Sequence, residues 1–480
     1  MKQIRRRVKV QSAYIYTILS LTTALVGFTP AVRAQSAPTA PSPTSTVVSE
    51  SQIKATQLLD QGVDKMRSNK YTPAIADFNQ AIQLNPDSAV AYYYRGTARH
   101  ELGDMQGALE DLNQAISLNP SYAPAYVNRG FIRGALGDGQ AATADFNQAI
   151  SFSPDSAPAY VNRGYTQASL GDLQASLDDF NQAIRLKPDF APGYLNRGFV
   201  RAALGETETA IADFDQAIKL KPKYAEAYLN RGFAHYQLGD REAAIADFDR
   251  AIDLKPNYAE AYFNRGFVYS ALGEPQIAVE DFDQALRLKP NSAKAYFNRG
   301  FANVAMGNSR EAVADFDQAL RINIDYAEAY KYRGDARVSL GDRQGASEDY
   351  MQAIRIKPDY AEAYKNRGDV LTSLGDLRGA SADYTQAIRI KPDYAEAYKN
   401  RGDVQADLGD KRGAAEDYSQ AIRTQPTYAA AYNSRGSTRS TVGDQQGAMQ
   451  DFQQAANLYL QLGMAEEYRG ILTQMRAMQR

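Results

Sequence analysis

Few residues of this sequence could carry out catalysis or bind a metal. Histidine occurs only at His100 and His235, and cysteine does not occur. The absence of cysteine excludes disulfides, thiolate metal sites and a cysteine nucleophile. The sequence also lacks the Gly-x-Ser-x-Gly motif of serine hydrolases and a phosphate-binding loop ending in Gly-Lys-Ser/Thr. We therefore predict that the protein is not an enzyme, that it has no catalytic residues, and that it binds no cofactor or metal.

Charged residues of opposite sign recur instead with a constant spacing. Eleven arginines, from Arg95 to Arg435, follow one another at intervals of 34 residues, and an aspartate follows each of them after 16 residues. If the two residues lie on antiparallel helices joined by a turn midway between them, each arginine faces its own aspartate. We predict a ladder of such pairs, for example Arg231 with Asp247, that stabilises the fold. A stripe of arginines that binds phosphate is the alternative interpretation.

The same interval of 34 residues governs most of the chain. We number the positions of each copy from 1, so that the first of twelve copies begins at Ala55 and the last ends at Leu462. Glycine stands at position 8 of every copy, and an aromatic residue stands at position 4 of all copies but the first. Alanine recurs at position 27, and proline closes most copies at position 32. The array thus occupies residues 55–462.

Each copy has the sequence signals of two helices. In the sixth copy, bulky residues recur at helical spacing over residues 225–238, and again over residues 242–254. Gly239 and Asp240 between them are typical of a helix end followed by a helix start. Pro256 ends the second helix. Such a pair cannot bury its apolar face alone, so the copies are expected to stack into an all-α solenoid.

Two further pairs have the spacing of a helix-capping box. They are Asp359 with Glu362 and Asp393 with Glu396, and each stands just before a first helix. In a capping box, a side chain at the N-cap accepts a hydrogen bond from a backbone N–H of the first turn. We therefore expect these aspartates to begin the first helices of the tenth and eleventh copies.

The pattern within one copy resembles the tetratricopeptide repeat family, in its 34-residue length and in the residues Tyr228, Gly232, Ala244, Phe248, Ala251 and Pro256. The resemblance covers residues 55–462 and is specific. It implies a right-handed superhelical solenoid of helix-turn-helix repeats. It also implies that the first helices line a concave groove, which holds an extended peptide or a helix of a partner protein.

Asparagine is frequent at position 6 of the repeats. In this respect the chain resembles peptide-binding arrays of the family, such as the one on the O-linked N-acetylglucosamine transferase. In those arrays the asparagine hydrogen-bonds the backbone of a threaded peptide, for which an amide offers both a donor and an acceptor. The alternative is that these amides bond their neighbours and stabilise stacking. The candidate peptide-binding asparagines are Asn128, Asn162, Asn196, Asn230, Asn264, Asn298, Asn366 and Asn400.

Positions 5 and 9 share a face of the first helix and divide the array in two. In repeats three to eight position 9 is aromatic, and the candidate residues are Phe131, Tyr165, Phe199, Phe233, Phe267 and Phe301. In repeats nine to eleven the candidates are charged, with Lys331, Lys365 and Lys399 at position 5 and Asp335, Asp369 and Asp403 at position 9. Position 24 changes from phenylalanine to tyrosine at the same place, beginning with Tyr350. Either a partner contacts an apolar and then a charged stretch, or these residues only pack and pair within the fold.

The N-terminus has the pattern of a secretory signal peptide. Residues 1–34 contain a basic start, an apolar stretch and small residues before Gln35. Cleavage there predicts an exported protein that is periplasmic, lumenal or extracellular, with no membrane span in the mature chain. An uncleaved N-terminal membrane anchor is the alternative. Residues 35–54 are rich in Ser, Pro, Thr and Ala and are typical of a linker that leads into the array.

Charge and the C-terminal segment complete the prediction. The formal net charge is −2, and the six basic residues of the leader leave −8 on the remainder, which is unfavourable for binding nucleic acid. Residues 463–480 predict a helix that caps the solenoid, or alternatively a docking helix. We predict an adaptor that binds a client protein or peptide in its groove. The alternative is a structural scaffold or spacer for envelope or photosynthetic-membrane complexes that acts through its outer faces.

Overall fold

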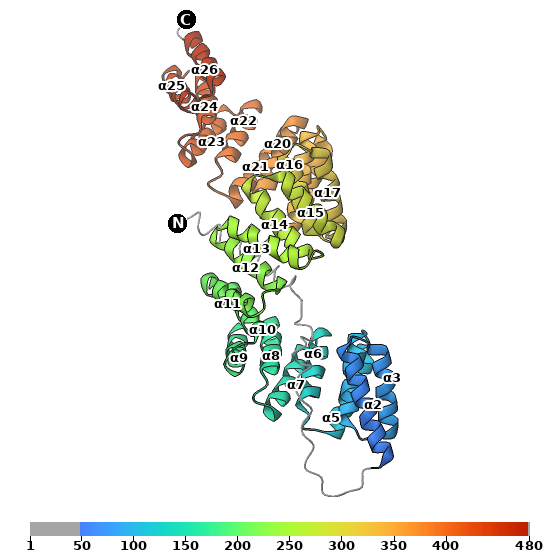
Figure 1. The fold of residues 1–480 in the computed structure, drawn as a ribbon. Helices are drawn as coiled ribbons and strands as arrows, with labels where there is room; N and C mark the ends of the chain where they lie inside the picture. The colour runs from blue at the N-terminus through green and yellow to red at the C-terminus, as the bar shows by residue number, and fades with distance from the viewer. Residues whose placement is uncertain (1–48, 479–480) are drawn as a thin grey trace. The chain divides into compact units, whose positions relative to one another are not determined.

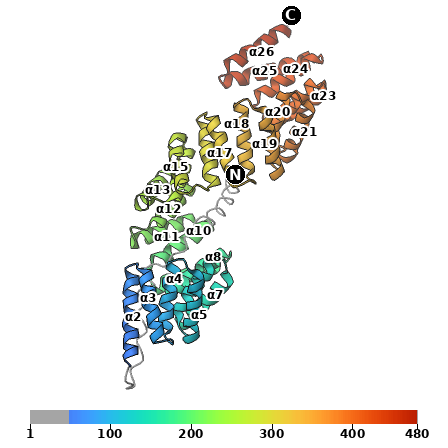
Figure 2. The same cartoon turned by 90° about the vertical axis from the view of Figure 1, so that its right-hand side faces the viewer.

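α-Helices form all the regular secondary structure of residues 49–478, the part of the chain that the computed structural model describes. Each repeat is a pair of antiparallel helices joined by a tight turn, and inside each compact unit of the chain consecutive pairs lie side by side, as α2, α3, α4 and α5 do in Figure 2. The chain divides into two compact units after Pro256. Within each unit the predicted all-α solenoid of helix-turn-helix repeats is confirmed (Figure 1).

The helices alternate between the first and the second helix of each repeat. Unit 1 contains α2 (Glu50–Arg67), α3 (Tyr71–Leu84), α4 (Ala89–Glu101), α5 (Met105–Leu118), α6 (Ala123–Ala135), α7 (Gly139–Phe152), α8 (Ala157–Ser169), α9 (Leu173–Leu186), α10 (Ala191–Ala203), α11 (Thr207–Leu220), α12 (Ala225–Leu238) and α13 (Arg241–Leu254). Unit 2 contains α14 (Ala259–Leu272), α15 (Pro275–Leu288), α16 (Ala293–Ala305), α17 (Ser309–Ile322), α18 (Ala327–Ser339), α19 (Arg343–Ile356), α20 (Ala361–Leu374), α21 (Leu377–Ile390), α22 (Ala395–Asp407), α23 (Lys411–Thr424), α24 (Ala429–Thr441), α25 (Gln445–Gln461) and α26 (Ala465–Met478).

The turn inside most repeats has the predicted glycine and aspartate caps. Gly239 ends α12 with φ of 89°, a left-handed conformation that costs glycine little. The side chain of Asp240 then accepts a hydrogen bond from the backbone N–H of Ala243 and begins α13. In the first repeat Asn69 takes the place of this glycine, with φ of 57°. Asparagine is one of the few other residues that tolerates this conformation.

The predicted capping boxes at the start of two first helices are wrong. The N-cap of α20 is Tyr360 and that of α22 is Tyr394, and neither side chain caps its helix. The tight turn after the proline places Asp359 one residue too early, because its carbonyl oxygen accepts from the N–H of Ala361. A side-chain cap does form at some first helices that have serine at the N-cap, as with Ser88 before α4 and Ser292 before α16.

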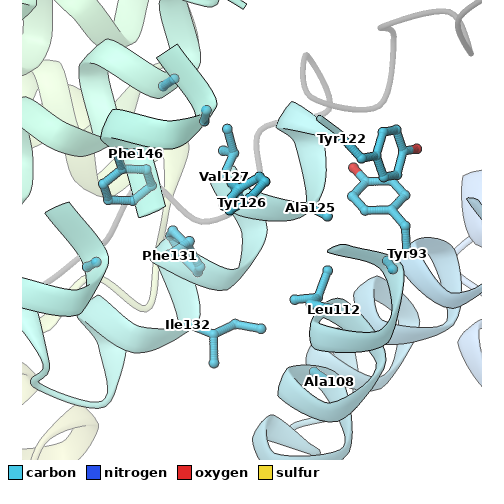
Figure 3. Packing of buried hydrophobic residues seen from close by; sticks show 14 residues of the cluster. Tyr93, Ala108, Leu112, Tyr122, Ala125, Tyr126, Val127, Phe131, Ile132 and Phe146 are labelled. Atoms are coloured by element: carbon cyan, nitrogen blue, oxygen red, sulfur yellow. The ribbon is translucent and has the colours of Figure 1, made fainter. Parts of the chain in front are cut away.

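Small residues let the two helices of a repeat approach closely. A Cβ atom on Gly232 would lie 2.9 Å from the ring of Phe248, so this position accepts only glycine without displacement of the ring. Ala244 and Ala251, on the facing helix, are completely buried. Apolar side chains also pack between neighbouring repeats. In Figure 3, Tyr93 of α4 lies against Tyr122, at the start of α6. Their ring centroids lie 5.2 Å apart, edge to face.

The two ends of the array differ from its interior. On α2, positions 3, 7 and 10 are the exposed polar residues Gln57, Gln61 and Asp64, whereas position 3 is alanine or glycine in every later repeat. In later repeats this face of the first helix packs against the preceding repeat. On α2, which no repeat of the array precedes, the same face is polar. At the other end α26 packs against α25, mainly through the buried Ile471.

The predicted signal peptide, residues 1–34, and most of the predicted linker lie outside the described residues. α2 begins at Glu50, so the last residues of the segment 35–54 already belong to the first helix of the array. Among residues 49–478, no helix combines the length and the apolar character that crossing a bilayer requires.

Candidate functional site

The predicted ladder of arginine–aspartate pairs is confirmed. In repeat six, Nε of Arg231 donates to Oδ2 of Asp247 over 2.9 Å, and Nη2 donates to Oδ1 over 2.6 Å. Asp247 is buried, and the same paired geometry recurs between first and second helices along both units. The hydrogen bond to Asp247 raises the pKa of Arg231. Because the aspartate occupies one edge of the guanidinium, the ladder is a structural element rather than an open anion-binding stripe.

Most ladder arginines also make a contact that the sequence prediction missed. Their remaining nitrogen, Nη1, donates a hydrogen bond to position 25 of the preceding repeat. Arg129 donates there to Asn113 over 2.7 Å, and Arg333 donates to Asp317 over 2.5 Å. Position 25 is asparagine or aspartate throughout repeats one to eight, which is the signal that would have revealed this contact. The ladder therefore links neighbouring repeats as well as the two helices of one repeat.

The first repeat keeps its aspartate paired by another route. Gln61 stands in place of the arginine, and Lys65, one turn later at position 11, lies 2.5 Å from Asp77. Position 11 supplies a second cation in some other repeats, as where Arg133 donates to Asp145 over 2.8 Å. A buried carboxylate without a cation is costly, so the replacement of the arginine requires this substitute.

Three candidate asparagines bridge neighbouring first helices. Asn128 is buried and donates to the hydroxyl of Thr97 over 3.0 Å. Asn366 donates to Asp335 over 2.9 Å, and Asn400 donates to Asp369 over 2.8 Å. In each case the acceptor is the polar residue at position 9 of the preceding repeat. The amide nitrogens of these three asparagines thus serve the stacking of repeats.

The other candidate asparagines follow a repeat whose position 9 is aromatic, and they make no such bridge. Asn196, Asn230 and Asn298 donate to the carbonyl oxygen four residues earlier on their own helices, over 2.8, 2.7 and 2.8 Å respectively. In these three the amide oxygen keeps its acceptor capacity. Asn162 and Asn264 are half-buried and make no side-chain hydrogen bond within residues 49–478.

The candidate aromatic residues differ in how much surface they offer. Phe131 is almost fully buried, with its ring centroid 5.5 Å from that of His100. Phe301 is 40% exposed and lies edge-on to Tyr332 at 5.3 Å. The remaining candidates are half-buried and comprise Tyr165, Phe199, Phe233 and Phe267. The position 5 residues of repeats three to six, such as Leu229, are buried in the core.

The candidate lysines and aspartates pair with each other along the first helices. The distances between Nζ and the carboxylate are 2.7 Å for Lys331–Asp335, 2.7 Å for Lys365–Asp369 and 2.6 Å for Lys399–Asp403. The lysine side chains are only 15, 19 and 23% exposed. The charged stretch is thus a set of half-buried ion pairs.

These pairs explain why position 24 changes with position 9. The hydroxyl of Tyr350 on α19 donates to Oδ1 of Asp335 on α18 over 2.8 Å, and Tyr384 and Tyr418 donate in the same way to Asp369 and Asp403. Burial, and then the nearby Asp335, raise the pKa of Tyr350, so its hydroxyl remains protonated and available as a donor. One polar contact between the helices replaces the aromatic packing of the earlier repeats.

Comparison with known families gives matches over most of residues 59–428. Models of the "TPR repeat" match residues 200–239, 234–273, 334–372 and 368–409. Models of the "tetratricopeptide repeat" match residues 59–123, 123–156, 157–190, 259–292, 293–326 and 395–428.

Matches to individual proteins are shorter or more distant. The human small glutamine-rich tetratricopeptide repeat-containing protein beta is 41% identical over 61 residues, which are 13% of this chain and 20% of that protein. The chain thus matches about a fifth of the length of this curated relative.

Two solved structures are also similar. MamA is 28% identical, over 34% of this chain and 96% of its own, with a TM-score of 0.33. YrrB, a "TPR protein with an unusual peptide-binding site", is 26% identical, over 38% of this chain and 95% of its own, with a TM-score of 0.35. With family models matching most of residues 59–428, and with the helix pairs that the structure contains, the chain belongs to the tetratricopeptide repeat family, a protein-interaction fold.

Proposed function

We propose that the protein is an adaptor that holds an extended segment of a partner protein along its first helices. The observation that carries this proposal is the state of the position 6 amides that follow an aromatic position 9. In unit 1, Asn162, Asn196 and Asn230 have no partner on a neighbouring repeat. Their free amide oxygens match the N–H groups of a peptide backbone without regard to its side chains.

The binding energy would come from many weak contacts. One hydrogen bond between neutral groups contributes about 0.5–1.5 kcal/mol. Each further repeat with a free amide adds a similar contribution, and the half-buried aromatic residues beside the amides, such as Tyr165 and Phe199, add apolar contact. An extended segment that spans several repeats satisfies this arrangement better than a small ligand does.

A crosslinking pull-down from the native extract tests the proposal. In the test variant, Asn162→Ala and Asn230→Ala remove from α8 and α12 two amides whose oxygen atoms accept no hydrogen bond from a neighbouring repeat. In the matched control, Gln114→Ala and Gln148→Ala remove two exposed amides from the second helices α5 and α7. We expect one partner to be recovered with the wild type and the control, and to be lost with the test variant. Circular dichroism at 222 nm establishes that both variants are folded.

The outer faces are the alternative site. Nine of the polar or charged candidates, including Asn366 and Lys331, already have side-chain partners within the fold, which favours a scaffold whose first-helix face is only structural. Exposed leucines such as Leu136 and Leu170, at the turns between paired helices, would then be available for contacts. Recovery of the same partners with both variants would support this alternative and contradict the adaptor.

We further propose that the protein is exported. The support is the sequence of residues 1–34, with its basic start, apolar stretch and small residues before Gln35. The charge of −8 that remains after this segment supports a protein partner rather than nucleic acid. Export would make the array available to partners outside the cytoplasm.

A further inference from the structure

One junction between repeats lacks the backward contact of the arginine ladder. In unit 2, Nη1 of Arg299 donates to Asp283 and Nη1 of Arg401 donates to Thr385, over 2.5 and 3.0 Å. At the junction of repeats nine and ten, however, position 25 is Met351, which is 47% exposed and offers no oxygen. Arg367 binds its own Asp383 but makes no hydrogen bond to the preceding repeat within the described part of the chain.

The first helices at this junction nevertheless remain joined. Asn366 on α20 donates to Asp335 on α18 over 2.9 Å, and Asp335 also accepts from Tyr350 on α19. The next junction has both contacts, because Asn400 donates to Asp369 and Arg401 donates to Thr385. Among the described residues, the side-chain hydrogen bonds between repeats nine and ten thus lie at the first helices only.

The buried apolar contact at this junction is equivalent to that at the next one. Ala346 and Tyr350 of α19 pack against Val370 of α20, as Ala380 and Tyr384 of α21 pack against Val404 of α22. The two junctions therefore differ in the hydrogen bond of the ladder arginine. In a repeat array each repeat is stabilised mainly by its neighbours, so the loss of a bond between two repeats lowers stability locally.

We propose that the junction of repeats nine and ten is a hinge within unit 2. The bond between Asn366 and Asp335 is the pivot, and the absent contact between Met351 and Arg367 lets α20 move away from α19. Such a motion changes the angle between the first helices α18 and α20 without breaking any arginine–aspartate pair. The hinge is a property of the fold and does not depend on the proposed adaptor function.

Hydrogen–deuterium exchange of the full-length protein, read by mass spectrometry, tests the hinge. In the wild type we expect the most protected amides of α20 to exchange faster than those of α22. Met351→Asp places an aspartate at position 25 of repeat nine. It copies the preceding junction, where Arg333 donates to the aspartate at position 25 of repeat eight, Asp317. We expect it to slow exchange in α19 and α20 roughly tenfold, as one charge-assisted hydrogen bond would, and to leave α21 to α24 unchanged.

Two controls decide the outcome. Met351→Leu keeps the side chain apolar and should leave the exchange of α19 and α20 as it is in the wild type. Asp317→Met removes the contact with Arg333 and should speed exchange at the junction of α17 and α18. The proposal is overturned if α20 and α22 exchange equally in the wild type, if Met351→Asp has no effect, or if Met351→Leu protects as strongly as Met351→Asp.

Discussion

At the scale of single residues, the buried aspartates of the second helices require a cation beside each of them. Each one is held by a guanidinium or an ammonium group, as Asp247 is by Arg231 and Asp77 is by Lys65. The pairing within a repeat follows from the spacing in the sequence, because the turn fixes which positions of two antiparallel helices meet. The contact with position 25 depends on the register between repeats, which the spacing within one copy does not specify.

Arg231→Ala should lower the stability of unit 1 strongly, because it leaves Asp247 charged and buried. Removal of one partner of a buried pair costs about 3–5 kcal/mol. Arg412→Ala is a suitable control, because the pair Arg412–Glu416 is exposed and such pairs contribute only about 0–1 kcal/mol. Urea denaturation followed by circular dichroism measures both variants. Equal effects of the two substitutions would contradict a stabilising role of the ladder.

A simple rule also describes whether an asparagine at position 6 forms a hydrogen bond with the preceding repeat. An asparagine that follows a polar position 9 bridges to it, as Asn128 does to Thr97, and an asparagine that follows an aromatic residue does not. Both residue types are visible in the sequence, so the rule could have been stated from it. The orientation of each asparagine side chain could not be predicted from the sequence, because it depends on the distance between neighbouring first helices.

At the scale of elements, the helix pair adapts to a change of chemistry without a change of geometry. In repeat eight, Phe301 and Phe316 occupy positions 9 and 24, and in repeat nine Asp335 and Tyr350 do so. Helix ends were predictable from the glycine and aspartate of each inner turn. The starts of the first helices were not, because the turn after the proline determines which residue becomes the N-cap, and it selects Tyr360 rather than Asp359.

Asp335→Phe alone should destabilise the ninth repeat, because it leaves the buried hydroxyl of Tyr350 without its acceptor. An unsatisfied buried polar group costs about 1–3 kcal/mol. The double variant Asp335→Phe with Tyr350→Phe recreates the pair of repeat eight, and its melting temperature should return toward that of the wild type. Thermal unfolding followed by circular dichroism distinguishes the two. A double variant that melts no higher than the single one would refute the coupling.

At the scale of the whole molecule, the array is a series of similar modules with specialised ends. The sequence predicts the number and order of the modules, because the 34-residue interval holds from Ala55 to Leu462. The hinge proposed at Met351 was not predictable from one copy, since it concerns a contact between two. The segment before the array carries the remaining prediction, which is the export of the chain.

Export predicts that the mature protein begins at Gln35, because Ala34 stands immediately before the expected cleavage site. Mass spectrometry of the protein from its native source measures the N-terminus directly. Ala34→Tyr places a large residue at the cleavage site and should cause the uncleaved chain to accumulate. An intact N-terminus on membrane-bound wild-type protein would show the anchored form, and an intact N-terminus in the cytoplasm would refute export.

The backward reach of the ladder arginines gives each unit a direction. Apart from Arg367, the ladder arginines inside each unit donate to the repeat before them, as Arg95 does to Asn79 and Arg435 does to Ser419. Loss of a repeat from the C-terminal end would leave every remaining contact of this kind in place, whereas loss of the first repeat would leave Nη1 of Arg95 without its acceptor. The two ends of the array are therefore unequal with respect to these contacts. Whole repeats can be removed or added more readily at the C-terminal end than at the N-terminal end.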